Sequence, residues 1–165
     1  KLIEEIRREA LTMVEKYELD AAKTTSLIPG VVETLKALKR MNLKIGLCTI
    51  NSENAVNYIL NRFGITQFFN VVVPRNKVNQ FKPHPEHIET ALKALGVSAK
   101  DTVIVGDSIT DMQSAKELQA IAVGLPTGVS TIEQLMRNGV NYIITSITDL
   151  PFLIEKINKI SEENP

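Results

Sequence analysis

Apolar residues along the chain gather in two kinds of segment, and the two kinds alternate. Short runs rich in Val, Ile and Leu are typical of strands buried in a sheet, whereas longer segments space their apolar residues as one face of a helix requires. The strand-like runs cover residues 44–49, 68–73, 103–106, 120–124 and 142–145. Because strands alternate with helices over short loops, the pattern predicts an α/β fold, with a parallel sheet and helices on both faces.

Helical spacing defines the connecting segments. It covers residues 1–17, 31–41, about 52–63, about 85–95, about 108–118, 131–137 and about 151–160. Residues 18–28 have a mixed pattern that predicts no element, and Pro29-Gly30 then interrupts the chain.

Composition limits the classes of partner. The chain has 165 residues with 19 basic and 19 acidic side chains, so no net field attracts nucleic acid or an anionic membrane. The apolar runs are too short to span a bilayer. A single cysteine, Cys48, favours a reducing, cytoplasmic location. The chain does not begin with Met and opens inside a helical pattern, so it could be part of a longer polypeptide.

The run from Val103 to Val105 ends in Gly106-Asp107, and Asp111 follows four positions later. In an open α/β sheet, ligands lie at the carboxyl ends of the strands. Two carboxylates that converge there suit Mg²⁺, which prefers oxygen ligands. The alternative is structural, with Asp107 as a turn residue and Asp111 favouring the start of a helix.

Two more polar residues follow strand ends or precede a helix. Thr49 ends the run at 44–49, and Lys82 precedes Pro83. Together with the aspartates they offer a hydroxyl, an ammonium and carboxylates, the set that a phosphate ester with Mg²⁺ requires. Each has an ordinary alternative, since Thr49 could be a β-branched strand residue and Lys82 a solvated lysine.

Other polar residues favour structural interpretations. Asn51 and Ser52 suit helix caps, although backbone N–H groups there could bind an anion. Cys48 suits a small buried apolar position. His84 and His87 are interpreted as surface or helix-start residues rather than bases.

These motifs, taken in order, resemble the haloacid dehalogenase (HAD) superfamily, and most closely its phosphatases of the phosphoglycolate phosphatase type. The likeness extends from about Pro29 to Leu150 and rests on Thr49, Lys82-Pro83 and the stretch from Gly106 to Asp111. It implies a HAD-type Rossmann-like core over residues 29–165. Residues 1–28 would be the tail of a helical cap.

The resemblance also implies roles. Thr49 would hydrogen-bond the transferring phosphoryl group, and Lys82 would neutralise the phosphate and the nucleophile. Asp107 would bind Mg²⁺, and Asp111 would complete the metal shell or orient Lys82. Asn51 is a further phosphate-binding candidate, but Ile50 separates it from Thr49, where relatives often have Asn directly after the hydroxyl residue.

One family motif has no counterpart here. Members of the family carry a strand that ends in two aspartates separated by one residue, and the first aspartate attacks phosphorus. Residues 1–28 contain only Asp20, with no strand before it, and we do not assign Asp20 as the nucleophile. The expectation is that the central strand and the nucleophile lie outside this chain, on an upstream segment that is continuous with it or supplied separately. A chain without that strand would be inactive.

The resulting hypothesis is a Mg²⁺-dependent phosphatase of a small phosphorylated metabolite, acting through an aspartyl phosphate. One alternative is a non-catalytic HAD-like module that binds phosphate or a protein. Another is a sugar-phosphate mutase of the same family. The sequence leaves the substrate open, and it also leaves open whether the chain forms a homo-oligomer.

Overall fold

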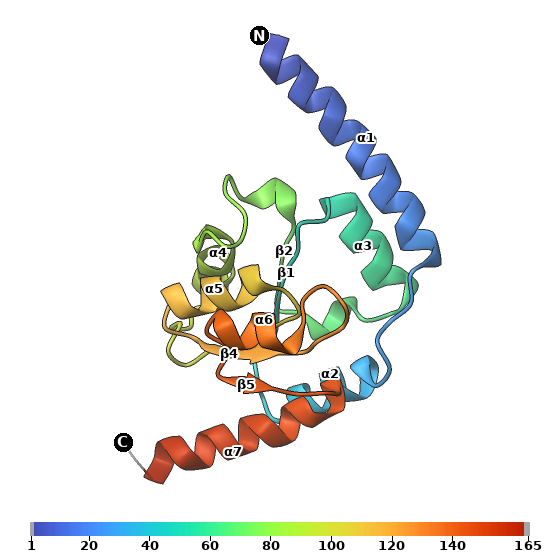
Figure 1. The fold of residues 1–165 in the computed structure, drawn as a ribbon. Helices are drawn as coiled ribbons and strands as arrows, with labels where there is room; N and C mark the ends of the chain where they lie inside the picture. Colours follow the sequence, from blue (N-terminus) through green and yellow to red (C-terminus); the bar gives the residue numbers. More distant parts are fainter. Residues whose placement is uncertain (1, 164–165) are drawn as a thin grey trace.

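Residues 2–163 are described by a computed structural model (Figure 1). Its elements alternate as the apolar pattern predicts. In order they are α1 (Leu2–Thr24), α2 (Val31–Arg40), β1 (Gly46–Cys48), α3 (Glu53–Arg62), β2 (Val71–Val73), α4 (Glu86–Leu95), β3 (Val103–Gly106), α5 (Ile109–Glu117), β4 (Ile121–Gly124), α6 (Ile132–Arg137), β5 (Tyr142–Ile143) and α7 (Leu150–Glu163). Short 3₁₀ turns cover Thr66–Phe68, Arg75–Lys77 and Ile147–Asp149. The predicted α/β class is confirmed.

The strands form two parallel sheets rather than one. β1 pairs with β2, with Gly46 opposite Val71, and the second sheet has the order β3-β4-β5. Within residues 2–163, one edge of β1 and one edge of β3 therefore have no strand partner. β3 covers its whole apolar run, whereas the other four strands are shorter than theirs, because each of those runs extends beyond its strand at one or both ends.

The expected burial of β3 is wrong. The apolar run at 103–106 predicts a fully buried strand, yet all four residues of β3 are only half-buried. The buried strand is its neighbour β4, in which Ala122 and Val123 are both inaccessible to solvent. The reason is position, since β4 has a neighbour on each side whereas β3 is an edge strand.

Helices cover both faces of the strands. Leu38 of α2 and Ile154 of α7 pack with Val123 on one face. Met112 of α5 and Leu135 of α6 pack against β4 on the other face. α4 lies against β1 and β2 (Figure 1). This arrangement leaves the carboxyl ends of the strands free for a site.

α1 is longer than the helix predicted at 1–17, because it continues through the mixed segment as far as Thr24. Its first half projects from the body of the molecule (Figure 1), and its apolar side chains there are exposed. They are Leu2, Ile3, Ile6, Leu11, Met13, Val14 and Tyr17. The division of the chain into a cap tail and a core stays a prediction. No helix within residues 2–163 is both long and apolar enough to cross a membrane.

Glu18 fixes the second half of α1 to the body. Its carboxylate accepts hydrogen bonds from both terminal nitrogens of Arg75 and from the backbone N–H of Ser52, at 2.9 Å for Ser52. Burial raises the pKa of Glu18, but the bonds from Arg75 and Ser52 outweigh it and hold the pKa below its usual 4.5. The charged form of Glu18 therefore stabilises the fold.

Glu18→Gln is expected to lower the free energy of unfolding by about 1–3 kcal/mol at pH 7, since it removes hydrogen bonds to a charged group. Because folding lowers the pKa of Glu18, this contribution to stability is present in full above pH 4.5. It is lost as the pH falls through the pKa that Glu18 has in the folded state. Urea unfolding at pH 7 and at pH 3 checks both points. Glu9→Gln, at an exposed position of α1, is the control, and an equal loss in the two variants would contradict the assignment.

Candidate active site

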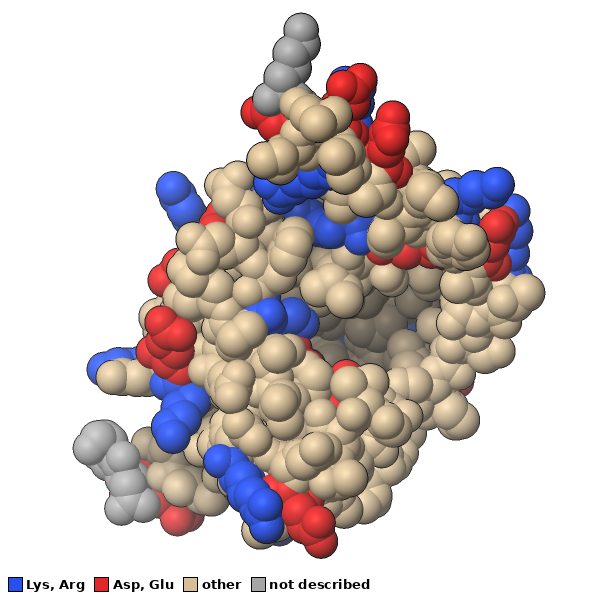
Figure 2. Space-filling model, turned by 45° about the horizontal axis from the view of Figure 1, so that its top comes forward, with Lys and Arg blue, Asp and Glu red and all other residues tan. Residues whose placement is uncertain are grey.

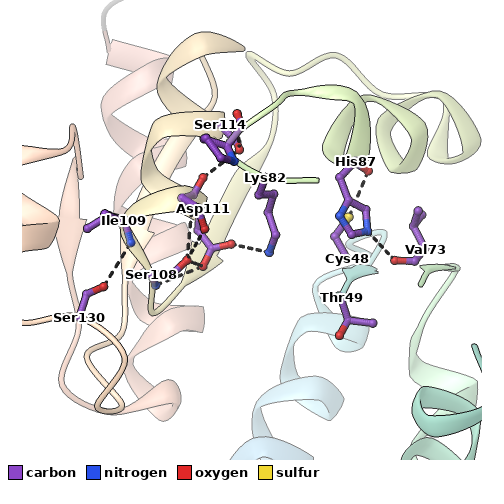
Figure 3. A network of polar contacts seen from close by, with 12 residues as sticks. Cys48, Thr49, Val73, Lys82, His87, Ser108, Ile109, Asp111, Ser114 and Ser130 are labelled. Carbon is purple, nitrogen blue, oxygen red and sulfur yellow. Dashed lines mark hydrogen bonds and ion pairs between the residues drawn. The ribbon is translucent and has the colours of Figure 1, made fainter. Parts of the chain in front are cut away.

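Side chains that follow β1 and β3 lie on either side of a gap (Figure 3). Viewed from the top of Figure 1, the molecule has a deep hollow beneath α1, with acidic and basic atoms at its rim (Figure 2). Thr49 lies at one side of this gap, and Lys82 and Asp111 lie at the other (Figure 3). Three of the sequence-predicted residues, Thr49, Lys82 and Asp111, therefore border one space.

Lys82 and Asp111 form an ion pair. Lys82 Nζ lies 2.5 Å from Asp111 Oδ1, and the two side chains are only 16% and 9% exposed. The loop that carries Lys82 is tied to α5, because the Ser114 hydroxyl donates to the Pro83 carbonyl oxygen at 3.0 Å. The ammonium is thus held at a defined place beside the gap.

Asp111 also caps α5. Its Oδ2 accepts hydrogen bonds from the hydroxyl of Ser108 at 2.7 Å and from the N–H of Ser108 at 3.2 Å. The Ser108 hydroxyl in turn accepts from the N–H of Asp111, which completes a capping box. The structural interpretation of Asp111 is therefore correct, and the same carboxylate holds Lys82. Both of its oxygens are engaged.

Asp107 lies in the turn between β3 and α5. Its Oδ2 accepts a hydrogen bond of 2.6 Å from the hydroxyl of Thr127, in the loop after β4. Its Oδ1 has no hydrogen-bond partner among residues 2–163. One carboxylate oxygen is thus available to a hard cation such as Mg²⁺. The described residues contain no cluster of three or more His, Cys, Asp or Glu side chains that could hold a metal by themselves.

The amides after β1 are largely occupied. The Thr49 hydroxyl accepts a bond of 3.2 Å from the N–H of Asn51. Ser52 caps α3 through Ala55 N–H, and its own N–H donates to Glu18. The N–H of Glu53 donates to the side chain of Asn76. Of the anion-binding amides considered at this helix start, those of residues 51–53 therefore already have partners, and the cap interpretation of Ser52 is correct.

His87 is the residue that sequence reasoning missed. It lies in the first turn of α4, as expected, but its side chain is fully buried rather than at the surface. Its Nε2 lies 2.8 Å from the Val73 carbonyl oxygen, and the Cys48 thiol donates to the His87 carbonyl oxygen at 3.5 Å (Figure 3). Burial lowers the pKa of His87, and nearby Lys82 lowers it further.

Cys48 is half-buried, and burial raises the pKa of its thiol to about 11, so the thiol stays protonated at neutral pH. Its interpretation as a small, unreactive side chain agrees with this environment.

Thr127 and Glu18 were also missed. Thr127 follows the end of β4, on the same edge as Asp107, and that placement was a usable signal. Nothing in the sequence signals the role of Glu18, because its partner Arg75 lies 57 positions further along the chain.

Comparison with protein families gives one match over most of the chain. A family model described as haloacid dehalogenase-like hydrolase matches residues 2–125. The chain is 33% identical over 134 residues to a phosphoglycolate phosphatase of Shigella boydii, a match that covers 81% of this chain and 53% of that protein. A phosphoglycolate phosphatase of Escherichia coli is also 33% identical, over 130 residues, which is 79% of this chain and 52% of the relative.

Solved structures with the same fold include a hydrolase from Pseudomonas syringae, with a TM-score of 0.76 and 27% identity over 84% of this chain and 63% of that one. A β-phosphoglucomutase from Clostridium difficile has a TM-score of 0.73 and 26% identity, over 86% of this chain and 62% of that one. The chain therefore spans about half the length of the curated relatives it matches, and less than two thirds of these two structures.

Proposed function

Because the chain belongs to the haloacid dehalogenase-like hydrolase family, we propose that it forms the main part of a Mg²⁺-dependent phosphatase of a small phosphorylated metabolite. The phosphoglycolate phosphatases among its relatives support this class of substrate.

The observation that carries the proposal is the buried pair of Lys82 and Asp111 beside Asp107. An ammonium held in place near the gap can stabilise negative charge on a phosphoryl group without reorganising during the reaction. Asp111 orients that ammonium, because its oxygens are committed to Lys82 and Ser108. Of the two roles that the resemblance implies for Asp111, these contacts favour the orienting one.

Asp107 is the residue that we propose holds Mg²⁺, through its free Oδ1. When bound, the ion supplies charge stabilisation to the phosphoryl oxygens. Thr127 fixes the other oxygen of Asp107 and so orients the free one toward the site. Thr49 donates its hydroxyl proton to a phosphoryl oxygen while the same hydroxyl accepts from the backbone N–H of Asn51, so Asn51 contributes through its side-chain amide. One aspartate is too few for a metal site, so further oxygen ligands come from substrate, water and the upstream segment.

The nucleophile, in this proposal, is an aspartate on that upstream segment, which fills the central strand position between β1 and β3. It attacks phosphorus with Lys82 beside it, while the P–O bond to the substrate alcohol breaks and the alcohol oxygen takes a proton from a general acid on the same segment. Water then hydrolyses the aspartyl phosphate to inorganic phosphate and the free aspartate. The two unpaired strand edges support this placement. The lone cysteine still favours the cytoplasm as its location.

Phosphoryl transfer to a sugar phosphate is the second candidate, favoured by the likeness to the β-phosphoglucomutase. A module that only binds phosphate is disfavoured, because a buried Lys82–Asp111 pair at this edge is costly to keep without a use.

The decisive experiment uses a polypeptide in which the upstream segment precedes residue 1. We expect release of inorganic phosphate from phosphoglycolate or an aryl phosphate with Mg²⁺ present, and loss of that release in EDTA. With a sugar monophosphate as substrate, formation of its isomer without free phosphate would support the mutase instead of the phosphatase. Phosphate binding without either product would support the non-catalytic phosphate-binding module.

A further inference from the structure

The loop between β4 and α6 is fixed at both ends to the turn between β3 and α5. At its start, the N–H of Leu125 donates to the Gly106 carbonyl oxygen at 2.9 Å. Near its end, the Ser130 hydroxyl accepts from the N–H of Ile109 at 3.2 Å (Figure 3). Because these two attachments flank the middle of the loop, they hold that part of the loop beside the turn.

Thr127 lies between the two attachments and occupies one oxygen of Asp107. Its hydroxyl donates to Oδ2 at 2.6 Å, a short distance of the kind that bonds to a charged carboxylate have. Among residues 2–163, no other group makes a hydrogen bond to the Asp107 carboxylate. Thr127 therefore sets how this carboxylate is turned, and it leaves Oδ1 as the oxygen without a partner.

The contact with Thr127 matters for the size of the cation that Asp107 can bind. Mg²⁺ binds oxygen at about 2.0–2.1 Å and demands near-octahedral geometry, which the narrow bite of a carboxylate that uses both oxygens does not suit. Ca²⁺ binds at about 2.3–2.6 Å in flexible geometry and accepts both oxygens of one carboxylate. An ion that used both oxygens of Asp107 would compete with the Thr127 proton for the electron density of Oδ2. The contact therefore acts against the larger ion.

We propose that the loop between β4 and α6 holds Asp107 as a one-oxygen ligand and thereby makes the metal site select Mg²⁺ over Ca²⁺. Thr127 and Ser130 are the positioning residues. Thr127 occupies Oδ2, and Ser130 fastens the loop that carries Thr127 to the start of α5. The inference rests on the proposed function, because it takes Asp107 to be the metal ligand of that site.

Three substitutions isolate the contribution of these hydroxyls. Thr127→Val removes the hydroxyl and keeps the branched shape of the side chain, at an exposed position outside the core. Thr127→Ser keeps the hydroxyl and is the conservative rescue, and Ser130→Ala releases the end of the loop. Thr102→Val is the matched control, since it removes a hydroxyl bond of 2.7 Å to the Ser98 carbonyl oxygen just before β3, at the opposite end of that strand.

The first readout is the affinity for each ion without substrate, measured by titration calorimetry on the polypeptide that carries the upstream segment. We expect Thr127→Val to raise the affinity for Ca²⁺ relative to Mg²⁺ about five- to tenfold, the change that loss of one competing hydrogen bond allows. Ser130→Ala should shift this ratio in the same direction by about two- to threefold, because the hydroxyl of Thr127 remains but is less firmly held. Thr127→Ser and Thr102→Val should leave the ratio unchanged.

The second readout is inhibition of phosphate release by Ca²⁺ at constant Mg²⁺. In Thr127→Val the Ca²⁺ concentration that halves the rate should fall by the same factor as the ratio of affinities. A change in the rate without a change in the response to Ca²⁺ would indicate a structural effect of the substitution and would contradict the proposal.

An unchanged ratio of the two affinities in Thr127→Val would overturn the proposal, and so would an equal shift in Thr127→Ser, which keeps the hydroxyl. An unchanged ratio in Ser130→Ala would overturn the part assigned to that residue. Failure of the proposed function is a different result, namely no Mg²⁺-dependent phosphate release by the unsubstituted polypeptide. Mg²⁺ binding and phosphate release with an unaltered ion preference in every variant would refute this inference alone.

Discussion

Asp107→Asn is expected to reduce Mg²⁺-dependent phosphate release by at least about a hundredfold in the polypeptide that carries the upstream segment. The amide keeps the shape of the side chain and an oxygen that can accept from Thr127, so the turn between β3 and α5 stays in place. It removes the negative charge that, in the proposed function, binds the metal. The measurement is the rate of phosphate release as Mg²⁺ is varied, together with thermal unfolding.

The control for this variant lies at the other end of the same strand. Asp101 precedes β3 at its amino end, is exposed and pairs only with Ser98. Asp101→Asn should leave both the rate and the Mg²⁺ dependence unchanged. If Asp107→Asn retained the full rate, Asp107 would not belong to the metal site, and the hollow beside it would have another use.

The apolar pattern predicted the order of strands and helices because each element buries an apolar face of its own. It could not predict that β3 is half-buried, since burial of a strand depends on its neighbours in the sheet. A run of Val and Ile looks the same whether one edge or both are paired. The expected position of a missing strand and the observed free edges of β1 and β3 agree, but the strand itself stays a prediction.

The candidate site residues also divide into those that the sequence could predict and those that it could not. Lys82, Asp107 and Asp111 could be found because each stands beside a strand end or a helix start, positions that a topology argument reaches. The sequence offered a metal ligand and a helix-start residue as alternatives for Asp111, and the resemblance added the orienting of Lys82. In the structure one oxygen of Asp111 caps α5 and the other holds Lys82. His87 could not be found, because a lone histidine in a helix gives no sign of which of its nitrogens lacks a partner.

The second large effect concerns the pairing of Lys82 with Asp111. Lys82→Met and Asp111→Asn should each lower the free energy of unfolding by about 1–3 kcal/mol, because each leaves a largely buried charge without its counterion. Asp111→Asn keeps an acceptor for Ser108, so the cap of α5 survives and the loss reports on the ion pair. Each variant should also lose phosphate release, since Lys82→Met removes the ammonium and Asp111→Asn removes the carboxylate that orients it.

The double variant separates pairing from simple desolvation. With both charges gone, no unpaired ion remains, so its destabilisation should be smaller than the sum of the two single losses by about 1–2 kcal/mol. The exposed pair of Asp20 and Lys23 on α1 is the matched control, since it too is in direct contact, at 2.8 Å, but lies 57–58% exposed. Its cycle should show no coupling at physiological salt. Additive losses for Lys82 and Asp111 would mean that their contact contributes nothing, and Asp111 would then be free to serve the metal instead.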